Sequence, residues 1–331
     1  MITKPKYSIV ICAYNEELRI YNCLKSLYSQ IKNNKNVEVL IINNESSDST
    51  LNQVELFINK YKPINFNLKT IKHVGLSESR NFGIDNTSGE FIIYTDADLL
   101  FDENWFVNII RGFDIADVYI ISGRVEHLNN ESKIATFLFY SHFNNLILNK
   151  TSRVLSDNES CVIGANMAFR RIAFDKYRFN EKILGRGDDN TIVRLIKSNG
   201  ESREYYENEA IVYNEHTDSI FTWLIQNKLA GKINAILDKS IKPLNFYKLL
   251  YYLIHLIILF ISIVYPLLIL NLILFTVRYL MKYKFLSSSF RSTLKEFTFP
   301  IALLIFPLHF IGTLTYDFFY LIEFFFKRTK L

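Results

Sequence analysis

The fold is decided by Gly89–Leu100, which has the sequence GEFIIYTDADLL. The β-branched and aromatic residues from Phe91 to Tyr94 predict a short buried strand. Two carboxylates in an Asp-x-Asp spacing, Asp96 and Asp98, follow it, and strand alternation would send both to the same side. Such close like charges repel unless a hard divalent cation neutralises them and takes oxygen ligands from them. The stretch therefore predicts a place to hold Mg²⁺ or Mn²⁺ against a diphosphate, with a turn that caps the next helix as the alternative.

Strand and helix patterns alternate ahead of this stretch. Apolar and β-branched runs predict strands over residues 7–13, 37–42 and 66–71. Apolar residues at helical spacing and polar capping residues predict helices after residues 15, 49 and 75. This alternation, with short connections, is typical of an α/β protein with a doubly wound parallel sheet.

Three polar loops each follow a predicted strand, at residues 13–16, 43–47 and 96–98. The carboxyl ends of parallel strands meet at one edge of a sheet, and ligands of doubly wound sheets bind outside that edge. The three loops are therefore predicted to converge on one nucleotide site.

The pattern is less regular beyond residue 100. Strands are predicted over residues 118–123 and 210–213, and the aromatic, amphipathic region 131–160 is predicted to be helical. Asp188 and Asp189 stand before a helix that is predicted to continue through Leu195. They could simply cap this helix, because the helix dipole favours an anion at its N-terminus.

Charge and cysteine content indicate an intracellular domain of ordinary character. The chain has 331 residues and a formal net charge of +5, so we expect no nucleic-acid partner. Cys12, Cys23 and Cys161 show no metal-binding spacing. An odd number of cysteines on predicted core elements fits reduced thiols in the cytosol better than a disulfide framework.

The C-terminal part is far more apolar than the rest. Two apolar stretches, at about 249–277 and 299–326, are each longer than the roughly 20 residues that cross a bilayer. Residues 1–240 are therefore predicted to form a catalytic domain and residues 241–331 a membrane-associated helical region. Basic residues between the two stretches and at the C-terminus favour the cytosolic side, and they leave the number of crossings open.

The motifs of residues 7 to about 216, taken in order, resemble the family 2 glycosyltransferases of GT-A fold. The residues that carry the resemblance are 9–17, 41–50, 79–84, 89–91, 96–98 and 187–189. The resemblance implies a Rossmann-like α/β fold with a mixed, mainly parallel sheet and helices on both faces. It also implies a metal-dependent enzyme that moves a sugar from a nucleotide-diphosphate donor to an acceptor hydroxyl and inverts the anomeric carbon.

The resemblance also assigns roles to individual residues. The nucleotide-binding residues would be Ala13, Tyr14, Glu16, Asn43, Arg80 and Asp96, with Asn43 facing the base and Asp96 touching the ribose. Asp98 would bind the Mg²⁺ or Mn²⁺ that bridges the diphosphate, with His216 as an additional ligand to the metal or phosphate. Asp189 would be the catalytic base that accepts the proton of the acceptor hydroxyl.

Two departures from the family pattern concern acidic positions. Asn43 and Asn44 stand where the family usually carries aspartate, so an amide oxygen without charge would meet the base. Asp188 replaces a glutamate and shortens the side chain beside Asp189. Neither change removes Asp98 or Asp189, so we expect an active enzyme.

These features together predict a membrane-anchored glycosyltransferase whose catalytic domain faces the cytoplasm of a bacterial-type plasma membrane. Its donor would be a nucleotide sugar, with a UDP-sugar favoured. Its acceptor would be a lipid-linked or membrane-proximal glycan in cell-surface polysaccharide synthesis. Two alternatives remain open: transfer of sugar to polyprenyl phosphate, and a non-catalytic, glycosyltransferase-like membrane scaffold.

Overall fold

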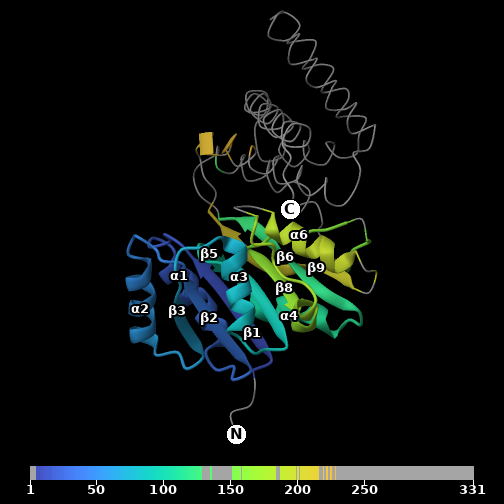
Figure 1. Ribbon diagram of the computed structural model, residues 1–331. Coiled ribbons are helices and arrows are strands. Elements are labelled where there is room, and N and C mark those ends of the chain that lie inside the picture. Colours follow the sequence, from blue (N-terminus) through green and yellow to red (C-terminus); the bar gives the residue numbers. More distant parts are fainter. Residues whose placement is uncertain are drawn as a thin grey trace, which may run out of the picture. The chain divides into compact units, whose positions relative to one another are not determined.

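The computed structural model describes residues 5–128, 135, 151–157, 159–183, 187–198, 200, 202–215, 219, 221–222, 224–225 and 228. The described residues from 5 to 128 and from 151 to 215 belong to one compact unit. This unit is built around a nine-stranded mixed sheet (Figure 1). The strand order is β3-β2-β1-β4-β8-β6-β9-β5, and β7 pairs with β9.

The first four strands of the chain are parallel. They are β1 (Tyr7–Ala13), β2 (Val37–Asn43), β3 (Phe66–Thr70) and β4 (Phe91–Asp96). Their registers run without a shift, and β1 lies between β2 and β4. The carboxyl ends of these strands therefore meet at one edge of the sheet, as the alternating pattern predicts.

The remaining strands make the sheet mixed. They are β5 (Leu99–Phe101), β6 (Val118–His127), β7 (Arg153–Val154), β8 (Asn166–Arg170) and β9 (Arg203–Asn214). Strand β8 is antiparallel to both of its neighbours, β4 and β6. Strand β6 runs parallel to β9, which pairs antiparallel with β5 and β7.

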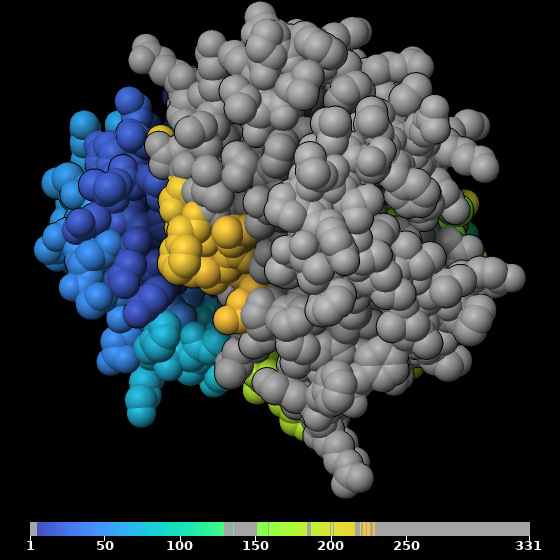
Figure 2. Space-filling model, turned by 90° about the horizontal axis from the view of Figure 1, so that it is seen from above, coloured from blue at the N-terminus to red at the C-terminus, as the bar shows by residue number. Residues whose placement is uncertain are grey.

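Helices cover both faces of the sheet (Figure 1). They are α1 (Ile20–Ile31), α2 (Thr50–Tyr61), α3 (Leu76–Asp85), α4 (Trp105–Arg111) and α6 (Asp188–Lys197), with short 3₁₀ turns η1 (Gly112–Asp114) and η2 (Arg171–Asp175). Right-handed crossovers in the order β3-β2-β1-β4 place α1 and α2 on one face and α3 on the other. Helices α1 and α2 pack together through Tyr21 and Phe57, whose rings meet edge-on at 6.2 Å, and they form part of the blue surface in Figure 2.

The core lies on both faces of the sheet. Val10, Leu40 and Ile92 share one cluster with Ile84 of α3 and Ile192 of α6. The residues next to Val10, Leu40 and Ile92 in the sequence are equally buried on the opposite face of the sheet. Strands β1, β2 and β4 are therefore continuous apolar runs. Gly83 lets α3 approach β1 closely, since a Cβ atom there would lie 2.6 Å from a methyl group of Val10.

Several predicted boundaries need correction. Helix α1 begins at Ile20, not near Asn15, because the backbone N–H groups of Glu16 and Glu17 donate to the side chains of Thr50 and Asp48. Residues 97–98 form a turn between β4 and β5, so strand alternation does not orient Asp98.

The region predicted to be helical over 131–160 contains the strand β7, because Arg153 and Val154 pair with β9. Strand β8 has no counterpart in the prediction. Among the described residues, no helix is long and apolar enough to cross a membrane. The apolar stretches at 249–277 and 299–326 lie outside the described residues, as does His216.

Candidate active site

The loops that follow β1 and β2 are joined by reciprocal hydrogen bonds. The Ser47 N–H donates to Asn15 Oδ1 (2.9 Å), and the Ser49 N–H donates to Glu17 Oε2 (2.8 Å). In return, the Glu17 N–H donates to Asp48 Oδ2 (3.1 Å). Asn15 adopts a φ of 57°, which an asparagine tolerates better than most residues. The two loops therefore hold each other in one shape before any ligand binds.

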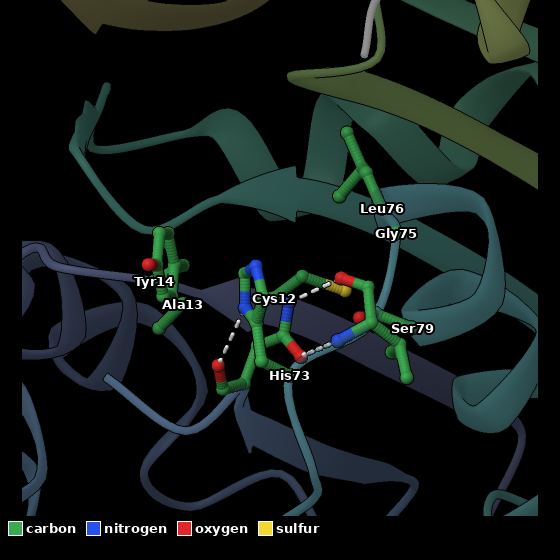
Figure 3. A pocket seen from close by; sticks show the side chains of 9 residues that line it. Cys12, Ala13, Tyr14, His73, Gly75, Leu76 and Ser79 are labelled. Carbon is green, nitrogen blue, oxygen red and sulfur yellow. Dashed lines mark hydrogen bonds between the residues drawn. The ribbon is translucent and has the colours of Figure 1, made fainter. Parts of the chain in front are cut away.

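A pocket of about 490 Å³ opens beside these loops, at the carboxyl edge of the sheet (Figure 3). It is lined by Cys12, Ala13, Tyr14, Asn44, His73, Val74, Gly75, Leu76 and Ser79. The rings of Tyr14 and His73 lie 4.3 Å apart at an angle of 33°. Tyr14 is 46% exposed, so its ring is accessible from solvent. A flat aromatic ligand such as a nucleobase could stack on an aromatic surface of this kind.

The pocket includes Asn44 and not the predicted Asn43. The Asn44 side chain bonds both backbone groups of Val74, accepting at 2.9 Å and donating at 2.8 Å. Asn43 is buried at the end of β2, where its Oδ1 accepts from the Ser46 N–H at 3.2 Å and its amide donates to Thr70. Both amides thus stabilise the loops, and contact of Asn43 with a base stays a prediction.

The Asp-x-Asp pair lies at the same edge of the sheet. Asp96 is the last residue of β4, and its side chain is 42% exposed. Partial burial and the negative charge of Asp98 raise the pKa of Asp96 to about 7, against the opposing charge of Arg80. Burial and the carboxylate of Glu16 likewise raise the pKa of Asp98.

The chemistry of this pair suits a divalent metal. The Oδ1 atom of Asp98 is buried and has no hydrogen-bond partner among the described residues. Mg²⁺ and Mn²⁺ prefer carboxylate oxygens of this kind, and Mg²⁺ commonly takes one or two carboxylates together with phosphate oxygens of a substrate. The described part of the chain holds no cluster of three or more metal-binding side chains. These residues therefore fit a metal that is completed by oxygens of its ligand.

Glu16 and Arg19 lie close to the Asp-x-Asp pair. Burial raises the pKa of Glu16, while Arg19, whose Nη1 is 3.5 Å from Glu16 Oε2, opposes this shift. Arg19 Nε also donates to Glu215 Oε2 (3.3 Å), one residue after β9. Arg19 therefore connects the first loop to the end of β9.

Arg80 lies beneath the site and is 3% exposed. Its Nη1 donates to Asp188 Oδ2 (2.6 Å), and its Nη2 donates to the Gly164 carbonyl (3.2 Å) and lies 3.8 Å from Asp96 Oδ1. Burial alone would lower the pKa of Arg80, but the carboxylates of Asp188 and Asp96 raise it. Arg80 does not line the pocket, so a contact with the nucleotide remains a prediction.

Asp189 lies in the first turn of α6. The helix begins at Asp188 with Gly187 as its N-cap residue, two residues earlier than a cap at Asp189 would require. Asp189 Oδ2 accepts from the Gly164 N–H (2.8 Å), and its Oδ1 accepts from the Asn190 N–H (2.7 Å). Burial and the neighbouring Asp188 raise the pKa of Asp189, while Arg80 and the two backbone donors oppose the shift.

The structure thus brings Ala13, Tyr14, Glu16, Arg80, Asp96, Asp98 and Asp189 to one edge of the sheet or directly beneath it. Sequence reasoning missed His73, Arg19 and Gly164. His73 and Arg19 belong to no recognisable sequence motif. Their partners, Tyr14 and Glu215, are distant in sequence and come close only in the folded chain. Gly164 precedes a strand that the sequence pattern did not predict.

Comparison with known proteins gives consistent family matches. The chain is 26% identical over 135 residues to the minor teichoic acid biosynthesis protein GgaB of Bacillus subtilis. The aligned residues make up 41% of this chain and 14% of GgaB. Across the first three curated relatives the match spans 14–40% of the relative's own length.

Two solved structures share the fold. One is the mannosyltransferase PcManGT from Pyrobaculum calidifontis in complex with GDP-Man and Mn²⁺ (TM-score 0.61, 15% identity, 99% of this chain and 89% of that one). The other is S. aureus TarS 1-349 in complex with UDP-GlcNAc (TM-score 0.50, 15% identity, 96% of this chain and 90% of that one).

The family itself is identified by residues 8–178, which match the model described as glycosyl transferase family 2. These residues contain β1 from Ser8 onward and all of β2 to β8, and with them both predicted nucleotide loops and the Asp-x-Asp turn. The match covers more than half of the 331 residues. This protein therefore belongs to glycosyl transferase family 2.

Proposed function

We propose that this protein transfers a sugar from a nucleoside-diphosphate donor to an acceptor hydroxyl and inverts the configuration of the anomeric carbon. The observation that carries the proposal is the pocket lined by Ala13 and Tyr14, at the sheet edge where β4 ends in Asp96 and the next turn carries Asp98. A pocket of this volume is large enough for a nucleoside, and the two carboxylates stand where a diphosphate would follow.

The acceptor hydroxyl is a poor nucleophile and needs a base. In the proposed reaction its oxygen forms a bond to the anomeric carbon while the bond to the diphosphate oxygen breaks and leaves its electron pair there. The hydroxyl proton moves to Asp189, whose raised pKa makes the carboxylate a better proton acceptor near neutral pH. A single displacement of this kind inverts the anomeric carbon and requires no second nucleophilic carboxylate.

The leaving diphosphate gains negative charge, which a bound Mg²⁺ or Mn²⁺ would offset as a Lewis acid. Asp98 would hold this cation, because its buried Oδ1 has no hydrogen-bond partner among the described residues. Asp96 would bind the ribose, and Glu16 would line the nucleoside from the first loop. His216 remains a candidate further ligand from sequence alone.

We place the reaction at a membrane. The apolar stretches at 249–277 and 299–326 are long enough to cross a bilayer, and their basic flanks favour a cytoplasmic catalytic domain. A membrane-held enzyme would meet a lipid-linked or membrane-proximal glycan, and the teichoic acid setting in the name of GgaB supports a role in cell-surface polysaccharide synthesis. Fractionation tests the anchor: the full chain should stay with membranes after a high-salt wash and leave them in detergent.

The central experiment is a screen of nucleotide sugars with the purified full-length protein, with Mn²⁺ or with a chelator. We expect Mn²⁺-dependent release of the nucleoside diphosphate from one donor, and UDP-sugars and GDP-mannose should be tested first. Product formation with polyprenyl phosphate, in place of a glycan acceptor, would identify the alternative transferase. Donor binding without any turnover across the screen would identify a non-catalytic scaffold and overturn the proposal.

A further inference from the structure

We propose that Arg80 is a positioning residue that fixes the catalytic carboxylate through the peptide of Gly164 and does not bind the donor. This inference rests on the proposed function, because it assigns to Asp189 the role of base. It reassigns Arg80, which the sequence resemblance places among the nucleotide-binding residues. The proposal is carried by the contacts of one buried guanidinium.

The first step is the direct ion pair below the site. Arg80 Nη1 lies 2.6 Å from Asp188 Oδ2, and both side chains are almost fully buried, at 4% and 3% exposure. A charged pair this deep is held in one geometry, because moving either partner leaves the other charge unpaired in a medium of low dielectric. Arg80 of α3 thereby fixes the first turn of α6, and Asp189 is the next residue of that turn.

The second step is the peptide of Gly164. Its carbonyl accepts from Arg80 Nη2 (3.2 Å), and its own N–H donates to Asp189 Oδ2 (2.8 Å). One residue thus connects the guanidinium to the carboxylate through two hydrogen bonds. A Cβ atom at this position would lie 2.5 Å from Arg80 Nη2, so a larger residue would have to displace the guanidinium.

The third step joins this network to the donor side. The same Nη2 atom is 3.8 Å from Asp96 Oδ1 at the end of β4. The guanidinium also lies over the rings of Tyr94 and Phe179, with its central carbon 6.0 Å and 5.6 Å from their centroids. Arg80 therefore has carboxylate, carbonyl and aromatic partners inside the protein, and it has no place on the wall of the pocket.

The test uses the full-length protein and two independent variants. Arg80→Lys keeps a positive charge but loses the planar fork that reaches two partners at once. Gly164→Ala keeps the arginine and displaces its guanidinium. In each variant we expect kcat to fall roughly 10–10²-fold, the scale of a misplaced catalytic group, with the Kd of the nucleoside diphosphate within about threefold of wild type.

Arg171→Lys is the matched control. Arg171 is half-buried, and its guanidinium donates to the carbonyls of Gly89 and Ile84 and to Thr87 Oγ1, and to no carboxylate of the site. This variant should lose thermal stability and keep kcat. The proposal is overturned if Arg80→Lys weakens nucleotide binding while kcat at saturating donor stays normal, or if its kcat falls no further than that of Arg171→Lys.

A second readout does not depend on turnover. The pKa of Asp189 can be followed by NMR of ¹³C-labelled aspartate, with its signal assigned through Asp189→Asn. The groups that face this carboxylate are Asp188 on its own helix, Arg80 on α3, Asp96 on β4 and the N–H groups of Gly164 and Asn190. Because Arg80 lowers the pKa of Asp189, that pKa should rise in Arg80→Lys and in Gly164→Ala and stay constant in Arg171→Lys.

The two readouts separate the failure of this proposal from the failure of the proposed function. A wild-type protein that turns over no donor with any acceptor would refute the proposed function, and the titration would still test the link between Arg80 and Asp189. An unchanged Asp189 pKa in both variants would refute that link whatever the activity is. If no donor is turned over, UDP and GDP with Mn²⁺ serve as the probes for nucleotide binding.

Discussion

The two halves of the described unit differ in how they hold their polar groups. The N-terminal half, Tyr7–Asp96, has parallel strands in unbroken register, and its polar loops bond to one another at the surface. The C-terminal half, Val118–Asn214, has two register shifts between β6 and β9 and buries whole carboxylates. Glu204, for example, is fully buried and accepts hydrogen bonds from Ser122 and from the Cys161 N–H.

Because of this difference, substitutions in the two halves should have different effects. A surface pocket made by preformed loops loses ligand affinity when one contact is removed. A buried carboxylate network loses the position or pKa of its members. We therefore expect changes in the surface loops of the N-terminal half to act on nucleotide binding and changes in the C-terminal half to act on turnover. Arg80 belongs with the second group, because it lies in the N-terminal half but is buried against Asp188 and Gly164.

The largest expected effect belongs to Asp189. Asp189→Asn removes the proposed proton acceptor, so kcat should fall roughly 10²–10⁴-fold. The Kd of the nucleoside diphosphate should barely change, because Asp189 lies in α6 and not on the pocket. Steady-state kinetics and calorimetry on the same preparation measure both, with exposed Asp85→Asn as the control. Near-normal turnover in Asp189→Asn would leave the mechanism without this base.

The next effect concerns Asp98. Asp98→Asn removes the anionic oxygen that has no partner in the described residues, so Mn²⁺-dependent nucleotide binding should weaken at least about 10-fold. Metal-independent binding, measured in a chelator, should stay the same. Asp175→Asn, an exposed carboxylate in η2, is the matched control. If Mn²⁺ strengthened nucleotide binding equally in wild type and in Asp98→Asn, residues other than Asp98 would hold the metal.

The halves also differ in how far the sequence predicted them. Strands β1, β2 and β4 could be predicted because strands buried on both faces are continuous apolar runs, and Asp96 could be placed because it ends one of them. Strand β8 could not, because Asn166–Arg170 is a short run without β-branched residues, and only its pairing with β4 and β6 in the fold makes it a strand. Gly164 was missed for the same reason, since its partners Arg80 and Asp189 meet only in the fold.

A smaller effect is expected at Tyr14, on the wall of the pocket. Tyr14→Ala should weaken nucleotide binding by about 1 kcal/mol, or roughly fivefold, the lower end of what loss of a stacked aromatic costs a base. The lower end applies because Tyr14 is half exposed and its ring already contacts His73 at a tilted angle of 33°. Tyr14→Phe retains the stacking surface and should bind normally. A drop in kcat at saturating donor in Tyr14→Ala would break the proposed separation of the halves.

The smallest effect is a pH dependence of stability at Asp96, where the two halves meet. The folded-state pKa of Asp96 is raised from 3.8 to about 7, so between these values the folded protein binds more protons than the unfolded chain. This group therefore lowers the free energy of unfolding as pH rises from about 4 to about 7, and contributes no further change above that. Exposure of the side chain limits the contribution to about 1 kcal/mol, or roughly 2–4 °C in Tm.

The side chain introduced by Asp96→Asn cannot ionise. In a chelator the Tm of this variant should therefore rise relative to that of wild type between pH 4 and pH 7, and the difference in Tm should be constant above pH 7. Added Mn²⁺ with nucleoside diphosphate should reduce the gain, because a nearby cation lowers the pKa of a carboxylate. Thermal unfolding at matched ionic strength measures both. Parallel Tm profiles of the two proteins across this range would mean that Asp96 ionises normally, and that Arg80 and solvent fully offset the charge of Asp98.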